Sequence, residues 1–199
     1  MKKLINPFRY LPLRQALCWG IAAMILMSVF CWQVGLRMSS ITQINYAGGS
    51  LMKATLQQLI AWLIFAVVLY VAGAVASKSV VLYVAGLLLS RSKPRFWDVA
   101  AFNLFARIPF DLSLLMFAIP SVRSVMGLIT DGSFETALQY TTLLMVVGLV
   151  SMIFSIWYFF WSYKAFAEAT NIKNGKGVAI FVLCFIVVYV GSAYVLQLV

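Results

Sequence analysis

Long apolar runs separated by short polar segments set the pattern of this chain. Runs of roughly 20 residues without charge are long enough for a helix to cross about 30 Å of hydrocarbon. The predicted spans cover residues 15–36, 55–76, 97–120, 137–163 and 177–199. Because the runs lack the alternation of a membrane barrel, we expect an all-α, polytopic membrane bundle of five transmembrane helices, folded as one membrane domain over residues 1–199.

The second apolar run has an extension that leaves its end undefined. Residues 77–79 read "SKS" and interrupt the run, and the further apolar piece "VVLYVAGLLLS" continues to residue 90. This piece is too short to cross alone, so it either prolongs the second helix or re-enters the inner leaflet. A sixth span here would place the last basic loop outside, which the charge pattern argues against.

The polar segments differ in character. Residues 1–14 interleave aromatic and basic side chains with Pro7 and Pro12, which suits a short interfacial segment lying on lipid headgroups. Residues 37–53 and the stretch "SVRSVMGLITDGSFET" are expected to be polar loops between spans.

The 15 lysines and arginines predict the orientation through their bias toward cytoplasmic loops. They cluster in the N-terminal segment, in the turn between the second and third spans, and in the connection between the fourth and fifth spans: Lys2, Lys3, Arg9 and Arg14; Arg91, Lys93 and Arg95; Lys164, Lys173 and Lys176. We therefore expect a cytoplasmic N-terminus, an outside C-terminus, and contact of the basic segments with anionic lipids at the cytoplasmic face.

Composition narrows the function. The chain is 64% hydrophobic and 10% charged, which leaves too little polar surface for a soluble domain. Histidine is absent, so the commonest general base and metal ligand are missing, and no enzyme, metal or cofactor is expected. The three cysteines lie in apolar runs without metal spacing and are expected to be small buried hydrophobes. The scattered basic clusters do not form a nucleic-acid-binding face.

The third span contains two charges, in "LFARIPFDLSLLMF". Each costs about 2.5 to 3.5 kcal/mol at mid-span on insertion scales. Arg107 and Asp111 are four residues apart and share a helix face, so we expect them to pair while facing protein. Pro109 between them should kink the helix. The pair is then a static latch, a working hinge or polar site, or a proton site at Asp111.

Four weaker signals complete the candidate sites. Asp98 is placed to cap the third span after the basic turn. A small-residue stripe in the fourth span predicts close helix packing, inside the monomer or between subunits; it consists of Gly148, Ser151 and Ser155. Four aromatic residues near the inner end of that span are expected to be interfacial anchors: Trp157, Tyr158, Trp161 and Tyr163. Lys164 and Glu168 are expected to form a solvated helical pair.

Two segments resemble the Yip1 domain family: "GLLLSRSKPRFWDVAAFNLFARIPFDL" and "IWYFFWSYKAFAEATNIKNGKGVAIFVLCFIVVYV". The resemblance rests on a basic turn, an Ala-Arg-x-Pro element in the third span, and a fourth span that runs through a polar turn into the last. It covers about the C-terminal two thirds. It implies a non-enzymatic multi-pass protein. Eukaryotic relatives act in vesicle transport and contact Rab-type GTPases and one another.

The chain departs from the eukaryotic members at its N-terminus. About fourteen residues precede the first span, and the long cytosolic part with an Asp-Leu-Tyr-Gly-Pro motif is missing. GTPase contact is therefore not expected, and the form resembles a compact bacterial member in the inner (cell) membrane. The first functional hypothesis is a membrane scaffold or adaptor in membrane organisation or trafficking, as a homo- or hetero-oligomer. The alternative is a small transporter or channel component using the Arg107 and Asp111 region.

Overall fold

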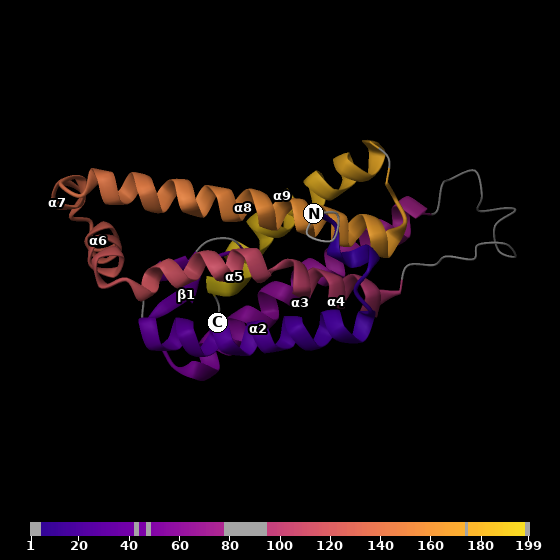
Figure 1. Ribbon diagram of the computed structural model, residues 1–199, viewed down its shortest axis with the longest axis horizontal. Coiled ribbons are helices and arrows are strands. Elements are labelled where there is room, and N and C mark those ends of the chain that lie inside the picture. The colour runs from indigo at the N-terminus through magenta and orange to yellow at the C-terminus, as the bar shows by residue number, and fades with distance from the viewer. Residues whose placement is uncertain (1–4, 42–43, 47–48, 78–94, 174, 198–199) are drawn as a thin grey trace, which may run out of the picture.

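A computed structural model describes residues 5–41, 44–46, 49–77, 95–173 and 175–197. Five long helical segments dominate it (Figure 1). They are α2 (Leu13–Val34), α3 (Leu51–Ser77), a broken third segment made of α4 (Phe96–Ala106), α5 (Ile108–Leu114) and the 3-10 helix η3 (Leu115–Ala118), α8 (Thr141–Thr170) and α9 (Gly175–Gln197). All five are long and apolar enough to cross a membrane. The prediction of a helical, multi-pass membrane protein with five spans is confirmed to this extent.

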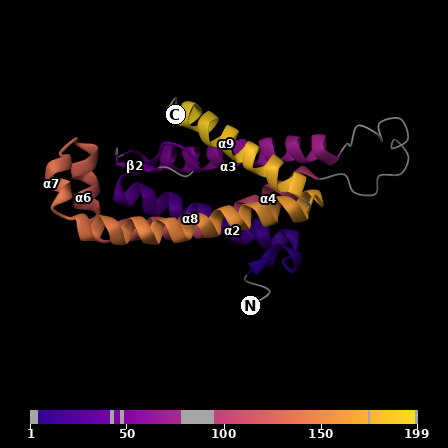
Figure 2. The same cartoon turned by 90° about the horizontal axis from the view of Figure 1, so that it is seen from above.

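The broken third segment lies in the middle of the bundle. It packs against α2, α3 and α8. In an 18-residue apolar stretch of each span, 67% of the residues are buried in the third segment and 11% in α8. Helix α9 crosses the bundle obliquely and packs mainly on α3 (Figure 2). Many small residues are completely covered at these contacts: Ala16, Ala61, Ala66, Ala100, Ala101, Ala106 and Ala165. Small side chains allow the helix backbones to approach closely, which is how apolar helices associate within lipid.

Two glycines mark the closest approaches between helices. A Cβ on Gly20 of α2 would lie 2.7 Å from Cγ of Leu104 in α4. A Cβ on Gly73 of α3 would overlap the side chain of Thr170 at the end of α8. Neither glycine was singled out from the sequence, because the need for a missing side chain depends on the neighbouring helix.

The two ends of the bundle carry different connections (Figure 1). At one end, called here the basic end, lie the start of α2, the start of α4 and the junction of α8 with α9; its described cations include Arg14, Arg95, Lys173 and Lys176. At the other, called the hairpin end, β1 (Leu36–Met38) and β2 (Ile44–Tyr46) form an antiparallel hairpin that pairs Leu36 with Tyr46. The hairpin end also holds α6 (Pro120–Thr130) and α7 (Phe134–Leu138).

These elements correct three predictions. The segments expected to be polar loops, 37–53 and 121–136, contain the hairpin, α6 and α7 instead. The fourth span was predicted at 137–163, but α8 starts four residues later and continues to Thr170, so most of the expected loop after Tyr163 is helix. Helix α8 ends where Asn171 adopts a left-handed conformation, with φ of 58°. Asparagine tolerates this conformation and commonly ends helices there.

The N-terminal segment packs on the protein. The 3-10 helix η1 (Pro7–Arg9) places Phe8 among aromatic rings of α4 and α8, where the side chain is 4% exposed. The apolar piece at 79–90 and the turn residues Arg91 and Lys93 lie outside the described residues.

Candidate functional site

The third segment breaks at Arg107, where α4 ends and α5 begins. Pro109 has no amide hydrogen and so cannot donate to the Phe105 carbonyl one turn earlier. The backbone N–H of Arg107 donates to the Leu104 carbonyl at 3.3 Å, a tightened turn, and the N–H of Asp111 donates to the Arg107 carbonyl at 3.1 Å. The third segment is therefore interrupted by a short break at Arg107, next to Pro109, while a change in helix direction stays a prediction.

Arg107 and Asp111 form the buried pair that their spacing predicted. Arg107 Nε lies 3.4 Å from Asp111 Oδ1, and the two residues are 5% and 4% exposed. This is long for a charge-assisted hydrogen bond, which is usually about 2.7–2.9 Å. The pair is joined by one contact rather than by a two-pronged one, so other groups must help to hold the guanidinium.

Two further groups hold the guanidinium. Its Nη2 lies 2.9 Å from Sδ of Met38, in the hairpin, and its central carbon lies 5.6 Å from the centre of the Phe110 ring. A cation over an aromatic face is attracted to the ring, more strongly where water is excluded. The arginine therefore links the break in the third segment to the hairpin, a partner that lies 69 residues away in the chain.

The hairpin is itself tied into the bundle. The backbone N–H of Met38 donates to Oε1 of Gln57 in α3 at 3.3 Å. The N–H of Ile41 donates to Oγ of Ser192 in α9 at 3.2 Å. Both backbone segments and both side-chain partners are buried. The hairpin thus closes its end of the bundle, with Met38 facing inward onto Arg107.

Two other polar side chains in the core lack full hydrogen bonding. Asn103 lies four residues before Arg107 and is 2% exposed, and within the described part of the chain neither its side-chain oxygen nor its nitrogen has a hydrogen-bond partner. Gln58 donates through Nε2 to Sγ of Cys31 at 3.9 Å, but its Oε1 has no partner among the same residues. A buried polar group without a partner costs roughly 1–3 kcal/mol. The side-chain amides of Asn103 and Gln58 therefore destabilise the core rather than hold it together.

An aromatic cluster anchors the N-terminal segment at the basic end. Phe8 contacts three rings, with centroids 5.6 Å away for Phe102, 5.9 Å for Phe105 and 6.0 Å for Trp161. Nearby, Asn6 Nδ2 donates to Oε1 of Glu168 at 2.9 Å. The segment expected to lie on headgroups is thus docked between α4 and α8.

The same region corrects the reading of the fourth span. Tyr158 and Trp161 are 3% and 7% exposed and pack inside the bundle, so they are not interfacial anchors. Glu168 pairs with Lys173 at 2.8 Å, whereas Lys164 lies over the Phe160 ring at 5.2 Å. The predicted pair of Lys164 with Glu168 is wrong.

Two further candidate sites, Asp98 and the small-residue stripe of α8, have other surroundings than expected. Asp98 lies within the first turn of α4, while Arg95 occupies the cap position and makes no side-chain capping bond there. The negative charge of Asp98 interacts favourably with the helix dipole, but Asp98 does not cap the helix. The small-residue stripe faces outward: Ser155 is exposed, and nothing lies within 4 Å of a Cβ placed on Gly148. Packing of this stripe inside the chain is therefore wrong; contact with another subunit stays a prediction.

Within the described part of the chain, no three Cys, Asp or Glu side chains stand together as a metal site would require. Comparisons with family models, with curated protein sequences and with solved structures give no match. The function of this chain is therefore inferred from its own geometry.

Proposed function

We propose that this chain is a non-enzymatic, Yip1-like membrane scaffold or adaptor, in which the Arg107–Asp111 pair fixes the packing of the bundle. One observation carries the proposal. Both charged residues are at most 5% exposed, and Arg107 is covered by the inward-facing Met38 of the hairpin. A group that handles a solute must meet that solute, whereas a latch needs only its protein partners.

The resemblance in the third and fourth spans supports the same class. Scaffolds in membranes act through helix faces that remain available to other proteins, and the outward stripe at Gly148 and Ser155 is such a face. We infer that this stripe contacts a second copy or another membrane protein. The basic end faces the cytoplasm and its anionic lipids, in keeping with the lysine and arginine bias.

Photo-crosslinking in native membranes tests the scaffold. A photoreactive residue at Ser155 is expected to give a discrete protein adduct, either of doubled mass or with one recurrent partner. The matched control is Ile186 on α9, which is also outward-facing at 54% exposed and should give lipid adducts. Lipid adducts alone at both positions would contradict a protein contact through the stripe.

The orientation has its own test. In a version without cysteines, Tyr10→Cys reports the basic end and Ser133→Cys reports the hairpin end; both positions are exposed. An impermeant thiol reagent added to intact cells is expected to label position 133 only. Labelling of position 10 from outside would reverse the proposed orientation.

A small transporter or channel component is the second candidate, and the unpartnered amide of Asn103 favours it. Intramembrane polar groups often mark solute pathways. Liposomes containing the pure protein separate the two candidates. The scaffold predicts that proton, potassium and chloride flux match protein-free liposomes. Flux above that level which Asn103→Leu abolishes would favour transport instead.

A further inference from the structure

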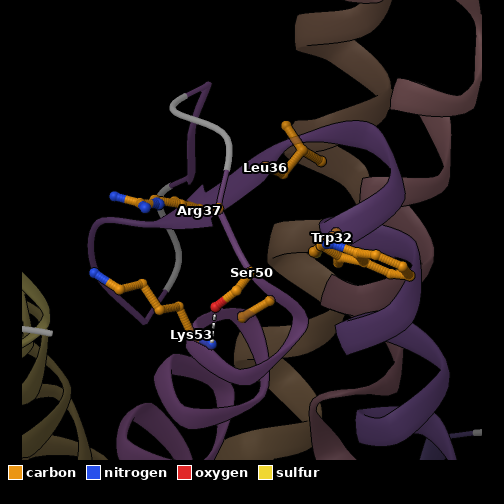
Figure 3. Close-up of a pocket in the computed structure, with 8 residues that line it drawn as sticks. Trp32, Leu36, Arg37, Ser50 and Lys53 are labelled. Carbon is orange, nitrogen blue, oxygen red and sulfur yellow. Dashed lines mark hydrogen bonds between the residues drawn. The ribbon is translucent and has the colours of Figure 1, made fainter.

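A shallow hollow lies at the hairpin end, between the end of α2 and the start of α3 (Figure 3). It is not an enclosed cavity, because its space includes open solvent. The hollow is lined by Cys31, Trp32, Leu36, Arg37, Gly49, Ser50, Lys53 and Ala54. Arg37 and Lys53 line it together and extend toward the same side in Figure 3. Met38 of the same strand is buried and contacts Arg107 instead.

The two cations in the hollow have no counter-charge. Among the described residues the ion pairs are Arg107 with Asp111 and Lys173 with Glu168. The other three of the five acids in the chain are Asp98, Asp131 and Glu135, and none of them lines the hollow. Arg37 Nε is enclosed by protein and has no hydrogen-bond acceptor among the described residues. No described acid neutralises the charges of Arg37 and Lys53, so an anion from outside the chain would be attracted to these two side chains.

The glycine at position 49 leaves space for the guanidinium of Arg37. Gly49 has φ of 153°, a conformation that residues with a side chain rarely adopt. A Cβ at this position would lie 3.0 Å from Arg37 Nε and 3.1 Å from Nη2. Only glycine therefore allows the guanidinium to lie against the chain just before α3.

The start of α3 adds hydrogen-bond donors to the two cations. The Ser50 hydroxyl accepts the backbone N–H of Lys53 at 3.3 Å, which leaves its own hydrogen for another acceptor. The first N–H groups of a helix point outward and favour negative charge. A guanidinium, an ammonium, a hydroxyl and a helix start together match the several oxygens of a phosphoryl group.

The surroundings of the hollow indicate where that phosphoryl group comes from. The hollow lies where two spans end, which is the depth of lipid headgroups. Trp32 lines it and is 46% exposed, and Met52 beside it is 78% exposed. Exposed tryptophan at the end of a span is typical of the interface between water and lipid. A lipid bound with its phosphoryl group in the hollow would lay its chains along these apolar side chains.

We propose that Arg37, Lys53 and the start of α3 bind the phosphoryl group of an anionic phospholipid headgroup at the hairpin end. This end is opposite to the one where the charge bias places anionic lipid. A zwitterionic headgroup fits less well, because its quaternary ammonium would be repelled by the two cations. The site therefore distinguishes phosphatidylglycerol from phosphatidylcholine.

Lipid titration of the full chain in one mild detergent tests the site. Dioleoyl phosphatidylglycerol, dioleoyl phosphatidylcholine and inorganic phosphate are added at equal concentrations, and native mass spectrometry and thermal unfolding report binding. The wild-type chain is expected to bind one phosphatidylglycerol in preference to the other two. Arg37→Gln should weaken that binding roughly tenfold, because a charge-assisted hydrogen bond is lost. Lys176→Gln removes an exposed cation at the basic end and should change binding less than twofold.

Each alternative result overturns part of the proposal. Equal binding of phosphatidylcholine would exclude selection for an anionic headgroup. Equal stabilisation by inorganic phosphate would exclude lipid as the source. If Arg37→Gln does not fold, Lys53→Gln provides the test, because its exposed side chain carries no packing. Unchanged binding in Lys53→Gln, or an equal loss in Lys176→Gln, would show that the hollow is not the site.

Discussion

The central third segment and α8 differ in what surrounds them. The third segment carries the buried residues Asn103, Arg107 and Asp111, and 67% of an 18-residue stretch of it is buried. The first half of α8 carries no charged residue and faces outward, with Met145, Leu149 and Ile153 all more than half exposed. Both are long enough to cross the bilayer. The difference shows that a span surrounded by protein can carry polar groups that a lipid-facing span cannot.

Breaking the charge pair is expected to have the largest effect on stability. Arg107→Ala or Asp111→Ala leaves one charge buried without its partner, which typically costs about 3 to 5 kcal/mol. Asp111→Ala should be the worse of the two, because a lone carboxylate can take up a proton whereas arginine effectively cannot. The double change to leucine should recover much of the loss. Thermal unfolding of the four proteins in one detergent measures the coupling.

The outward-facing helix provides the control for this comparison. Ile153→Ala on α8 removes a side chain that is 61% exposed and should leave the unfolding temperature in detergent nearly unchanged. If the losses at Arg107 and Asp111 simply add, the two residues serve different partners and the latch is wrong.

Alanine substitutions at Gly20, which is buried between helices, and at Gly148, which faces outward, are expected to differ by an intermediate amount in stability. Gly20→Ala places a methyl group 2.7 Å from Leu104 Cγ, and such overpacking typically costs about 1 to 3 kcal/mol. Gly148→Ala meets nothing within 4 Å and should be neutral, or stabilising by up to about 1 kcal/mol through helix propensity. The unfolding temperatures of both variants, measured in one detergent, test this difference. Equal behaviour would mean that α2 and α4 do not approach as closely as described.

A single hydrogen bond between helices gives the smallest expected effect. Trp62 Nε1 of α3 donates to the Ala100 carbonyl of α4 at 3.0 Å. Trp62→Phe keeps a ring but removes this donor, and we expect a loss of about 0.5 to 1.5 kcal/mol. Trp97→Phe, at a position that is 63% exposed, is the control and should change stability by less. A larger loss at Trp97 would contradict the central placement of α4.

The sequence predicted those features that depend on neighbours along the chain. Span number follows from run length, and the pair of Arg107 with Asp111 follows from a separation of four residues in a helix. The break follows from Pro109. Each of these can be seen within a short window of residues.

The missed features depend on segments that meet only after folding. Met38 reaches Arg107 from 69 residues away, and no local pattern indicates it. A short aromatic and basic segment reads the same whether it faces headgroups or protein, so the docking of Phe8 was missed. Gly148 and Gly20 look equally suited to close packing, and only the position of Leu104 distinguishes them.

The length of α8 has a consequence for the N-terminal segment. Its 30 residues span about 45 Å at helical rise, well beyond the roughly 30 Å of hydrocarbon in a typical bilayer. Glu168, with its bonds to Asn6 and Lys173, lies in the last turn of α8, where surplus length projects into the headgroup layer. A thicker bilayer would submerge these polar contacts unless the helix tilts less. We therefore expect protease to reach the N-terminal segment less readily in 22-carbon than in 14-carbon lipids, so that the cleavage rate of this segment reports bilayer thickness.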